Sequence, residues 1–238
     1  MKIEEIRINK YLASLGVGSR REIDRLIEEG KIKVNGEIIS AGIKVTEEDE
    51  IEVKGKKIEK TGEKKVYYML NKPLEILSSA KDDRGRKTVV DLIRCKERIF
   101  PIGRLDYNTT GLILLTNDGE LFNRVIHPRS EIYKEYYVKV LGEIKESSIK
   151  KLENGVELED GKTLPAYVKV LSKERGKSEL LISIREGRNR QVRRMLDAVN
   201  HPVVILRRER IGKLALGKLR VGEYRELTAE EVKYLYSL

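Results

Sequence analysis

The stretch Gly103–Gly119, GRLDYNTTGLILLTNDG, carries the residues on which both fold and function depend. Its apolar run Leu112–Leu115, followed by the turn-forming Asn117–Gly119, predicts a short buried strand that ends in a turn. Asp106 stands just ahead of that strand, beside Arg104. A fixed carboxylate next to a cation is suited to act as a nucleophile, because the cation keeps the carboxylate ionised. Taken alone, this Asp is more typical of a turn former or a surface ion-pair partner than of a nucleophile.

The composition is that of a globular protein without a metal centre. The 238 residues are 39% hydrophobic and 37% charged, and no apolar run approaches the length of a membrane-spanning helix. One cysteine and two histidines are too few for a zinc site with nitrogen and sulfur ligands. We therefore expect a cytoplasmic protein with no metal, no cofactor and no membrane partner.

Positive charge is concentrated near the carboxyl end. The formal net charge is +10. The segment from Arg185 to Arg225 contains twelve Lys and Arg residues but only four acidic residues. Ten of the twelve are arginines, which suit bidentate phosphate contacts. A charge run is often only a solvated face, but this bias favours a polyanionic partner.

The first sixty residues read as a small independent unit. Apolar residues at helical spacing predict a helix around residues 8–15. Ser19 and Glu22 form a capping box ahead of a second helix, and Gly30 stands where its C-terminal cap belongs. Asn35-Gly36 between two short apolar runs predicts a tight β-hairpin. Two antiparallel helices followed by a hairpin are expected.

Five cations of this unit are candidates for RNA binding. The second helix should present three of them on its exposed side, and the following strand begins with the other two: Arg20, Arg21, Arg25, Lys31 and Lys33. In this order, the stretch RINKYLASLGVGSRREIDRLIEEGKIKVNGEII resembles the S4-type RNA-binding domain. We predict an S4-like domain over residues 1–60, a polar linker over 61–65 and a larger domain over 66–238.

The larger domain should be built on a substantial sheet. Alternating apolar patterns predict strands at residues 66–70, 136–141, 166–171 and 180–184. Helical spacing predicts helices near 121–126, 147–153 and 191–199. The fold class is therefore α+β, with a mixed, mainly antiparallel sheet and flanking helices.

Four segments of the larger domain, in sequence order, resemble the rRNA pseudouridine synthases of the RsuA/RluB-like family that carry an S4 domain. They are YYMLNKP (67–73), GRLDYNTTGLILLTNDGEL (103–121), KEYYVKV (134–140) and REGRNRQVRRML (185–196). One position departs from the family pattern: Glu75 replaces a frequent glycine two residues after the proline of NKP. This departure puts the turn after the first strand in question, not the chemistry.

The resemblance implies roles for matching residues. Asp106 would be the catalytic aspartate, Tyr136 the aromatic that stacks on the target base, and Arg193 the arginine that pairs with Asp106. Without the resemblance, Tyr136 would be interpreted as an ordinary aromatic residue of a strand, and Arg193 as a residue that contacts phosphate. Further candidates for binding the substrate are Arg104, Ile184, Arg188, Arg190, Gln191 and Arg194. Arg104 would support the flipped nucleotide or bind a phosphate. Ile184 would line the pocket for the base or be an ordinary residue of the hydrophobic core.

The resemblance implies a monomeric enzyme that isomerises one uridine in rRNA to pseudouridine. It favours a target in the large-subunit rRNA, as in the RluB-like members of the family. Two alternatives stay open: a non-catalytic RNA-binding ribosome-assembly factor, and a glycosidase that releases uracil. Gly212–Lys218 has P-loop spacing, but Leu219 stands where a Ser or Thr is required. Asp118 and Glu120 follow the strand, so they should lie away from Asp106 rather than form a carboxylate pair with it.

Overall fold

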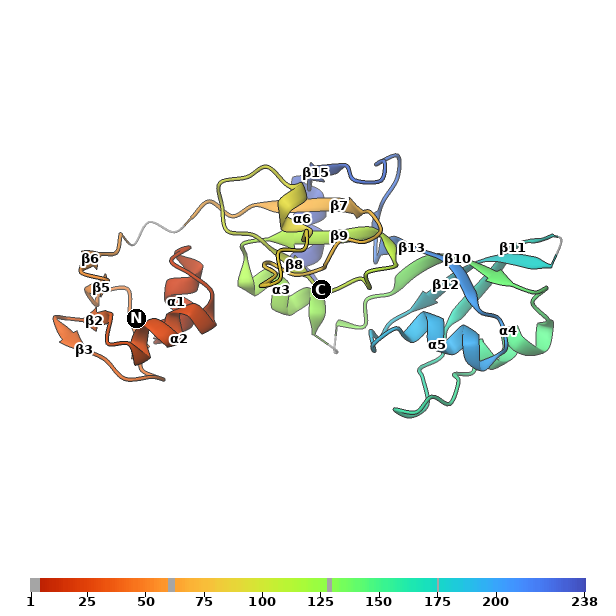
Figure 1. The fold of residues 1–238 in the computed structure, drawn as a ribbon, viewed down its shortest axis with the longest axis horizontal. Coiled ribbons are helices and arrows are strands. Elements are labelled where there is room, and N and C mark those ends of the chain that lie inside the picture. Colours follow the sequence, from red (N-terminus) through yellow and green to blue (C-terminus); the bar gives the residue numbers. More distant parts are fainter. Residues whose placement is uncertain (1–4, 60–62, 128–129, 175) are drawn as a thin grey trace. The chain divides into compact units, whose positions relative to one another are not determined.

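The computed structural model describes residues 5–59, 63–127, 130–174 and 176–238. The chain forms two compact units (Figure 1). The smaller runs to Val66 and includes the short segments Cys95–Arg98 and Asn117–Gly119, and the remainder forms the larger unit. Of the predicted linker over 61–65, residues 61 and 62 lie outside the described residues.

The smaller unit contains the predicted helical hairpin and β-hairpin. Its helices are α1 (Ile8–Ser14) and α2 (Arg20–Glu28). Its strands are β1 (Ile6–Arg7), β2 (Ile32–Val34), β3 (Glu37–Ile38), β4 (Lys44–Val45), β5 (Ile51–Val53) and β6 (Lys56–Lys57), with β1 paired to β4 and a sheet in the order β3-β2-β5-β6.

Local sequence signals explain the smaller unit well. The Ser19 side chain accepts a hydrogen bond from the backbone of Glu22, and the Glu22 side chain accepts one from Ser19, which completes the predicted capping box. Gly30, which follows the C-terminal end of α2, has a φ angle of +64°. In the β-hairpin, Asn35 and Gly36 take the positive φ angles of a primed turn. The two helices pack their apolar faces onto a small core that includes Leu12, Ile23 and Ile32.

The larger unit is built on one mixed sheet in the order β11-β12-β10-β13-β9-β7-β15. Its strands are β7 (Tyr67–Lys72), β8 (Phe100–Ile102), β9 (Thr110–Thr116), β10 (Lys134–Leu141), β11 (Tyr167–Glu174), β12 (Lys177–Ile184), β13 (Val203–Ile211), β14 (Leu214–Ala215) and β15 (Tyr224–Glu226). Its helices are α3 (Gly119–Ile126), α4 (Glu146–Glu153), α5 (Gln191–Ala198), α6 (Ala229–Tyr236) and the single-turn η1 (Val90–Leu92). The β13–β9 pair is parallel and the other pairs are antiparallel, so the α+β prediction is confirmed.

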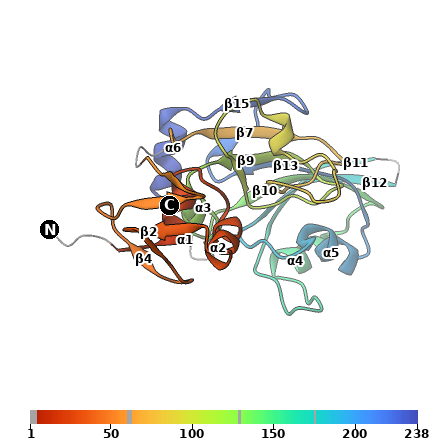
Figure 2. The ribbon, with the colours of Figure 1, turned by 60° about the vertical axis from the view of Figure 1, so that its left-hand side comes forward.

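The first of two hydrophobic cores in the larger unit lies on one face of strands β10 and β12. Val138, Leu180 and Ile182 point from these strands toward Leu152 of α4 and Met195 of α5, and Figure 2 shows both helices on the same side of the strands. A second core lies between β7, β9 and the helices α3 and α6. Because side chains alternate along a strand, Lys134 and Tyr136 share the helix-covered face with Val138.

Candidate active site

The loop that carries Asp106 joins β8 to β9 and is held in place by hydrogen bonds on both sides of the carboxylate. Thr109 N–H donates to the Asp106 carbonyl over 3.0 Å. On the other side, the Ser78 hydroxyl accepts from Leu105 N–H over 3.1 Å and donates to the Leu105 carbonyl over 2.8 Å. Asp106 itself is half-buried. The predicted carboxylate therefore has a fixed backbone, as a nucleophile requires.

Glu75 supports the same loop from the β7 side. Its backbone has φ of +60°, and its N–H donates to the Tyr107 carbonyl over 2.9 Å. A left-handed backbone is costly for a residue with a Cβ. The turn thus keeps the geometry that suits glycine although Glu occupies it, and the chain bears local strain to hold the residue after Asp106.

Lys72, the lysine of NKP, lies buried behind the loop. Its ammonium donates to the carbonyls of Pro73 and Thr109 over 2.9 and 3.0 Å, and its side chain is inaccessible to solvent. Burial lowers the pKa of Lys72 to about 8, although the Asp106 charge acts in the opposite direction. The sequence motif contained Lys72, but nothing in the pattern predicted that it would be a buried cation close to the candidate catalytic carboxylate.

A cavity of about 720 Å³ opens over this loop, a volume typical of small-molecule sites. Seven of the predicted site residues line it: Arg104, Asp106, Tyr136, Ile184, Arg188, Arg190 and Gln191. Tyr136 is half-buried on β10, and Ile184 is buried on β12. The Asp106 carboxylate, the Tyr136 ring and the apolar Ile184 therefore line one cavity, the combination expected for a flipped base; Glu131, Glu186 and Phe122 also line it.

Arg193 lies beneath the Asp106 loop, but the predicted direct ion pair between the two residues is wrong. Within the described chain, no guanidinium nitrogen of Arg193 lies within 4.0 Å of the Asp106 carboxylate. Instead, Arg193 donates to the Asn108 carbonyl over 2.7 Å and to the Val203 carbonyl over 3.4 Å. Helix α5 places the guanidinium against the loop backbone two residues past Asp106.

Electrostatics still couples the two residues. Burial and the neighbouring Arg190 lower the pKa of Arg193, while the Asp106 charge raises it. Arg193 is only 8% exposed, so a cation held here depends on the carbonyls and on the carboxylate charge for its stability. Arg193 therefore sets the position of the loop and contributes positive charge beside it.

Arg188, Gln191 and Arg194 have internal partners that the charge pattern did not reveal. Arg188 donates to the carbonyls of Gly161 and Lys162, each over 2.7 Å, and Arg194 forms a bidentate pair with Asp160. The phosphate role predicted for these two arginines does not fit such contacts, because a guanidinium that holds a loop has few donors left. Both arginines tie α5 to residues 160–162.

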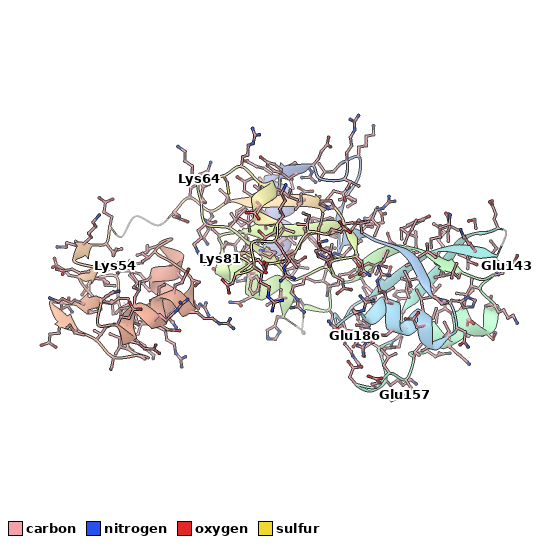
Figure 3. All side chains as sticks on the ribbon, viewed as in Figure 1. Lys54, Lys64, Lys81, Glu143, Glu157 and Glu186 are labelled. Carbon is pink, nitrogen blue, oxygen red and sulfur yellow. The ribbon has the colours of Figure 1, made fainter. Side chains whose placement is uncertain are left out.

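Gln191 is buried and organises the segment ahead of α5. Its amide accepts from Arg188 N–H over 3.0 Å and donates to the Glu186 carboxylate over 2.6 Å. Glu186, labelled in Figure 3, lies on the chain between β12 and α5. The glutamine thus shapes one wall of the cavity through its neighbours.

Arg104 and Arg190 keep the exposure expected of substrate contacts. Both line the cavity and are exposed. Arg190 precedes α5 with φ of +48°, and its guanidinium lies 3.4 Å from the Asn108 side-chain oxygen. These two arginines remain predictions for binding the nucleotide or a flanking phosphate.

Two cations of the cavity escaped sequence analysis. Arg208 of β13 is 5% exposed, and its Nε donates to the Leu112 carbonyl over 2.7 Å. Its backbone packs so tightly on Gly111 that a Cβ there would lie 2.3 Å from the Arg208 carbonyl oxygen. Lys134 begins β10 on the same side of the sheet. The signal missing from the sequence was the parallel β13–β9 register, which pairs Arg208 with Gly111.

In the smaller unit, the five predicted RNA-binding cations are all exposed. Arg20, Arg21 and Arg25 follow the outer side of α2, as predicted. Lys33 lies on β2, and Lys31 just before it pairs with Glu29 over 2.6 Å. Their exposure is compatible with contacts to a polyanion.

Two further observations concern the described residues only. None of their helices is long and apolar enough to cross a membrane. No cluster of three or more His, Cys, Asp or Glu side chains among them is arranged to hold a metal ion.

The fold and the cavity define a nucleotide-modifying domain attached to a small RNA-binding module, and comparisons with known proteins give the family. The family described as RNA pseudouridylate synthase matches residues 66–198, and the S4 domain matches residues 6–51. The chain belongs to the RNA pseudouridylate synthase family and is an enzyme of the isomerase class.

Relatives match over nearly the whole chain. Ribosomal large subunit pseudouridine synthase B of Bacillus subtilis is 50% identical over 236 residues, which cover 98% of this chain and 96% of that protein. An uncharacterized RNA pseudouridine synthase of Aquifex aeolicus is 46% identical and covers 98% and 94%. A crystal structure of a pseudouridylate synthase superposes with a TM-score of 0.71 at 32% identity, over 97% of this chain and 99% of the other.

Proposed function

We propose that this enzyme isomerises one uridine of large-subunit rRNA to pseudouridine, with Asp106 as the catalytic residue. The observation that carries the proposal is the half-buried Asp106 in a cavity with Tyr136, on a loop held by Lys72 and Arg193. The likeness to a ribosomal large subunit enzyme supports the choice of substrate. We further propose that the enzyme acts as a monomer in the cytoplasm.

The geometry suggests how the residues divide the work. The target base must leave the helical stack before a carboxylate can reach it, and exposed Arg104 at the cavity can brace the vacated position. Inside, Tyr136 and Ile184 would hold the uracil ring between an aromatic face and an apolar wall. Asp106 would attack the nucleotide and form a bond to it, and the N1–C1′ bond would break. The uracil would then rotate and rejoin C1′ through C5, the bond to Asp106 would break again, C5 would lose its proton and N1 would gain one.

The uracil can rejoin the sugar only if it stays in the cavity after the N1–C1′ bond breaks. The bond that breaks and the bond that forms involve the same sugar and the same base, so apart from the proton lost from C5 and the proton gained at N1 no group leaves or joins the nucleotide. The apolar side of the cavity at Ile184 would hold the detached uracil in place, which would separate this reaction from that of a glycosidase. Glu120 lies on α3, at the far end of β9 from Asp106, and the ion pair of Glu120 with Arg124 gives it a separate role.

The test is Asp106→Asn, which removes the nucleophile but keeps the side-chain shape. We expect pseudouridine formation on large-subunit rRNA fragments to be lost, while the affinity for the fragment changes by less than about threefold. The control is Glu120→Gln, which neutralises a carboxylate outside the cavity and should retain activity. Equal yields from Asp106→Asn and wild type would contradict the catalytic role.

Substrate choice and reaction type need separate readouts. Small-subunit and large-subunit fragments are compared side by side, and modification of the former alone would contradict the large-subunit target. Free uracil in the supernatant would identify a glycosidase. Binding without any product from wild type on either fragment would favour a non-catalytic assembly factor.

A further inference from the structure

A pair of cations, Lys134 and Arg208, lines the cavity beside Tyr136. Arg208 lies opposite Tyr136 in the β10–β13 pair, and Lys134 is two residues before Tyr136 on the same face of β10. Within the described chain, neither cation has an acidic oxygen within 4.0 Å. Both residues line the cavity.

The two cations are only partly satisfied by the protein. Arg208 uses Nε to hold the Leu112 carbonyl, but its buried Nη2 has no hydrogen-bond partner among the described residues. Lys134 has one long contact, 3.5 Å from its ammonium to the Arg185 carbonyl. Burial and the nearby Arg208 charge lower the pKa of Lys134, so the charged form of Lys134 is less favourable in the absence of an anion.

This arrangement contrasts with the other arginines near the cavity. Arg188 and Arg194 are neutralised by Glu186 and Asp160. Arg185 and Arg193 each have a buried Nε without a partner among the described residues, but Arg185 pairs with Glu131, and Arg193, which donates to two carbonyls, does not line the cavity. A buried cation with a free donor costs folding free energy unless a ligand supplies the missing acceptor. The evidence for a ligand is therefore the combination at Arg208 and Lys134: an unpaired donor, no acidic oxygen within 4.0 Å among the described residues, and a position on the cavity wall.

We propose that Lys134 and Arg208 form an anion subsite that binds a phosphate of the flipped nucleotide, next to the ring of Tyr136. The inference rests on the proposed function, because the anion belongs to the RNA substrate. A phosphodiester fits better than a neutral group, since its oxygens accept several hydrogen bonds and carry the charge that two adjacent cations lack. The subsite would fix the sugar-phosphate while Asp106 and the base react.

A uracil carbonyl could also accept from a guanidinium, and the experiment separates the two sources. RNA fragments carry the target uridine with one neutral methylphosphonate, placed either 5′ or 3′ of it. A second set carries 4-thiouridine or 2-thiouridine, in which sulfur, a weaker hydrogen-bond acceptor, replaces one carbonyl oxygen of the base. Binding is measured in the Asp106→Asn background, so that the result does not depend on turnover.

The variant is Lys134→Met, which removes one charge and only one long hydrogen bond. We expect affinity for the unmodified fragment to fall roughly tenfold, and the slope of log K against log salt to become shallower by about 0.7. A methylphosphonate at one of the two positions should weaken wild type by a similar factor but Lys134→Met much less. Thiouridines should affect both proteins equally.

The control is Lys139→Met on the same strand. Lys139 points to the opposite face of β10 and pairs with Glu179 over 2.9 Å, so its loss should leave the methylphosphonate effect unchanged. Arg208→Met is measured only if circular dichroism shows native folding, because that side chain also holds β9.

The outcomes are decisive in both directions. An equal methylphosphonate effect in wild type and Lys134→Met at both positions overturns the phosphate subsite. Coupling to a thiouridine instead of a phosphate also overturns it and assigns the cations to base recognition. Since all readouts are binding, they remain valid even if no pseudouridine is formed, in which case the proposed function fails and the subsite is judged separately.

Discussion

Cations occupy two different environments in this protein. On α2 of the smaller unit, Arg20, Arg21 and Arg25 are exposed. Around the Asp106 loop of the larger unit, Lys72 and Arg193 are buried and donate to backbone carbonyls. The same charge therefore serves two purposes: a hydrated cation attracts a polyanion at long range, and a dry one fixes the position of a loop.

The largest effect should come from the buried set, at Arg193. Arg193→Met removes the hydrogen bond to the Asn108 carbonyl and the positive charge near Asp106. Misplacement of a catalytic group by about 1 Å can cost about a hundredfold in rate, and we expect kcat to fall by about that factor. KM should change little, because the guanidinium faces the loop. Single-turnover pseudouridine formation checks this.

Arg194→Met is the matched control, since it removes the adjacent arginine, whose partner is Asp160. Its activity should remain within about threefold of wild type. If Arg193→Met instead raised KM and left kcat intact, Arg193 would act on substrate affinity, and the distinction between buried and exposed cations would break at this residue.

Lys72 offers a test of burial by pH. Its pKa of about 8 in the folded protein is below the value of about 10.4 in an unfolded chain. Between these values the unfolded state binds more protons, so stability should rise with pH. We expect the unfolding free energy of wild type, relative to Lys72→Met, to increase by about 2 kcal/mol between about pH 7.5 and about pH 10.

Urea denaturation at the two pH values measures this difference, and subtracting Lys72→Met removes the other titrating lysines and tyrosines. A flat difference would mean that Lys72 keeps an ordinary pKa. In that case solvent reaches the ammonium, and Lys72 belongs with the exposed cations rather than with Arg193.

The sequence predicted whatever depends on neighbours along the chain. The capping box of Ser19 and Glu22, the hairpin at Asn35-Gly36 and the strand that follows Asp106 all arise from local chemistry. The motif resemblance placed Tyr136 and Asp106 at one cavity, as the structure has them.

Long-range partners could not be predicted in the same way. The arginine-rich segment gave no sign that Asp160, more than thirty residues earlier, holds Arg194. The β13–β9 register that brings Arg208 to the cavity depends on a parallel pairing between strands distant in sequence. For the same reason, the carbonyl rather than the carboxylate as the hydrogen-bond acceptor of Arg193 emerged only from the packing of α5.

The smallest of the three effects should come from the exposed set on α2. We propose that Arg20, Arg21 and Arg25 contact RNA phosphates, and that the triple charge reversal to Glu weakens binding of the rRNA fragment roughly tenfold at moderate salt. The salt slope should also become shallower, because fewer counterions are released on binding. The rate with saturating RNA should stay unchanged, since these residues lie outside the catalytic domain. Filter binding across a salt series and single-turnover rates measure the two quantities.

The matched control reverses the same number of charges at Lys54, Lys56 and Lys57, which are exposed around the β5–β6 turn of the same unit. Net charge then changes equally, so a general loss of attraction would affect both triple variants alike. A weaker effect for the control assigns the contact to the surface of α2. Equal losses would show that only the total charge of the unit matters, and an unchanged affinity for the α2 variant would remove that helix from the RNA interface. A fall in the saturated rate would instead mean that the exposed arginines, like Arg193, help to position the reacting groups.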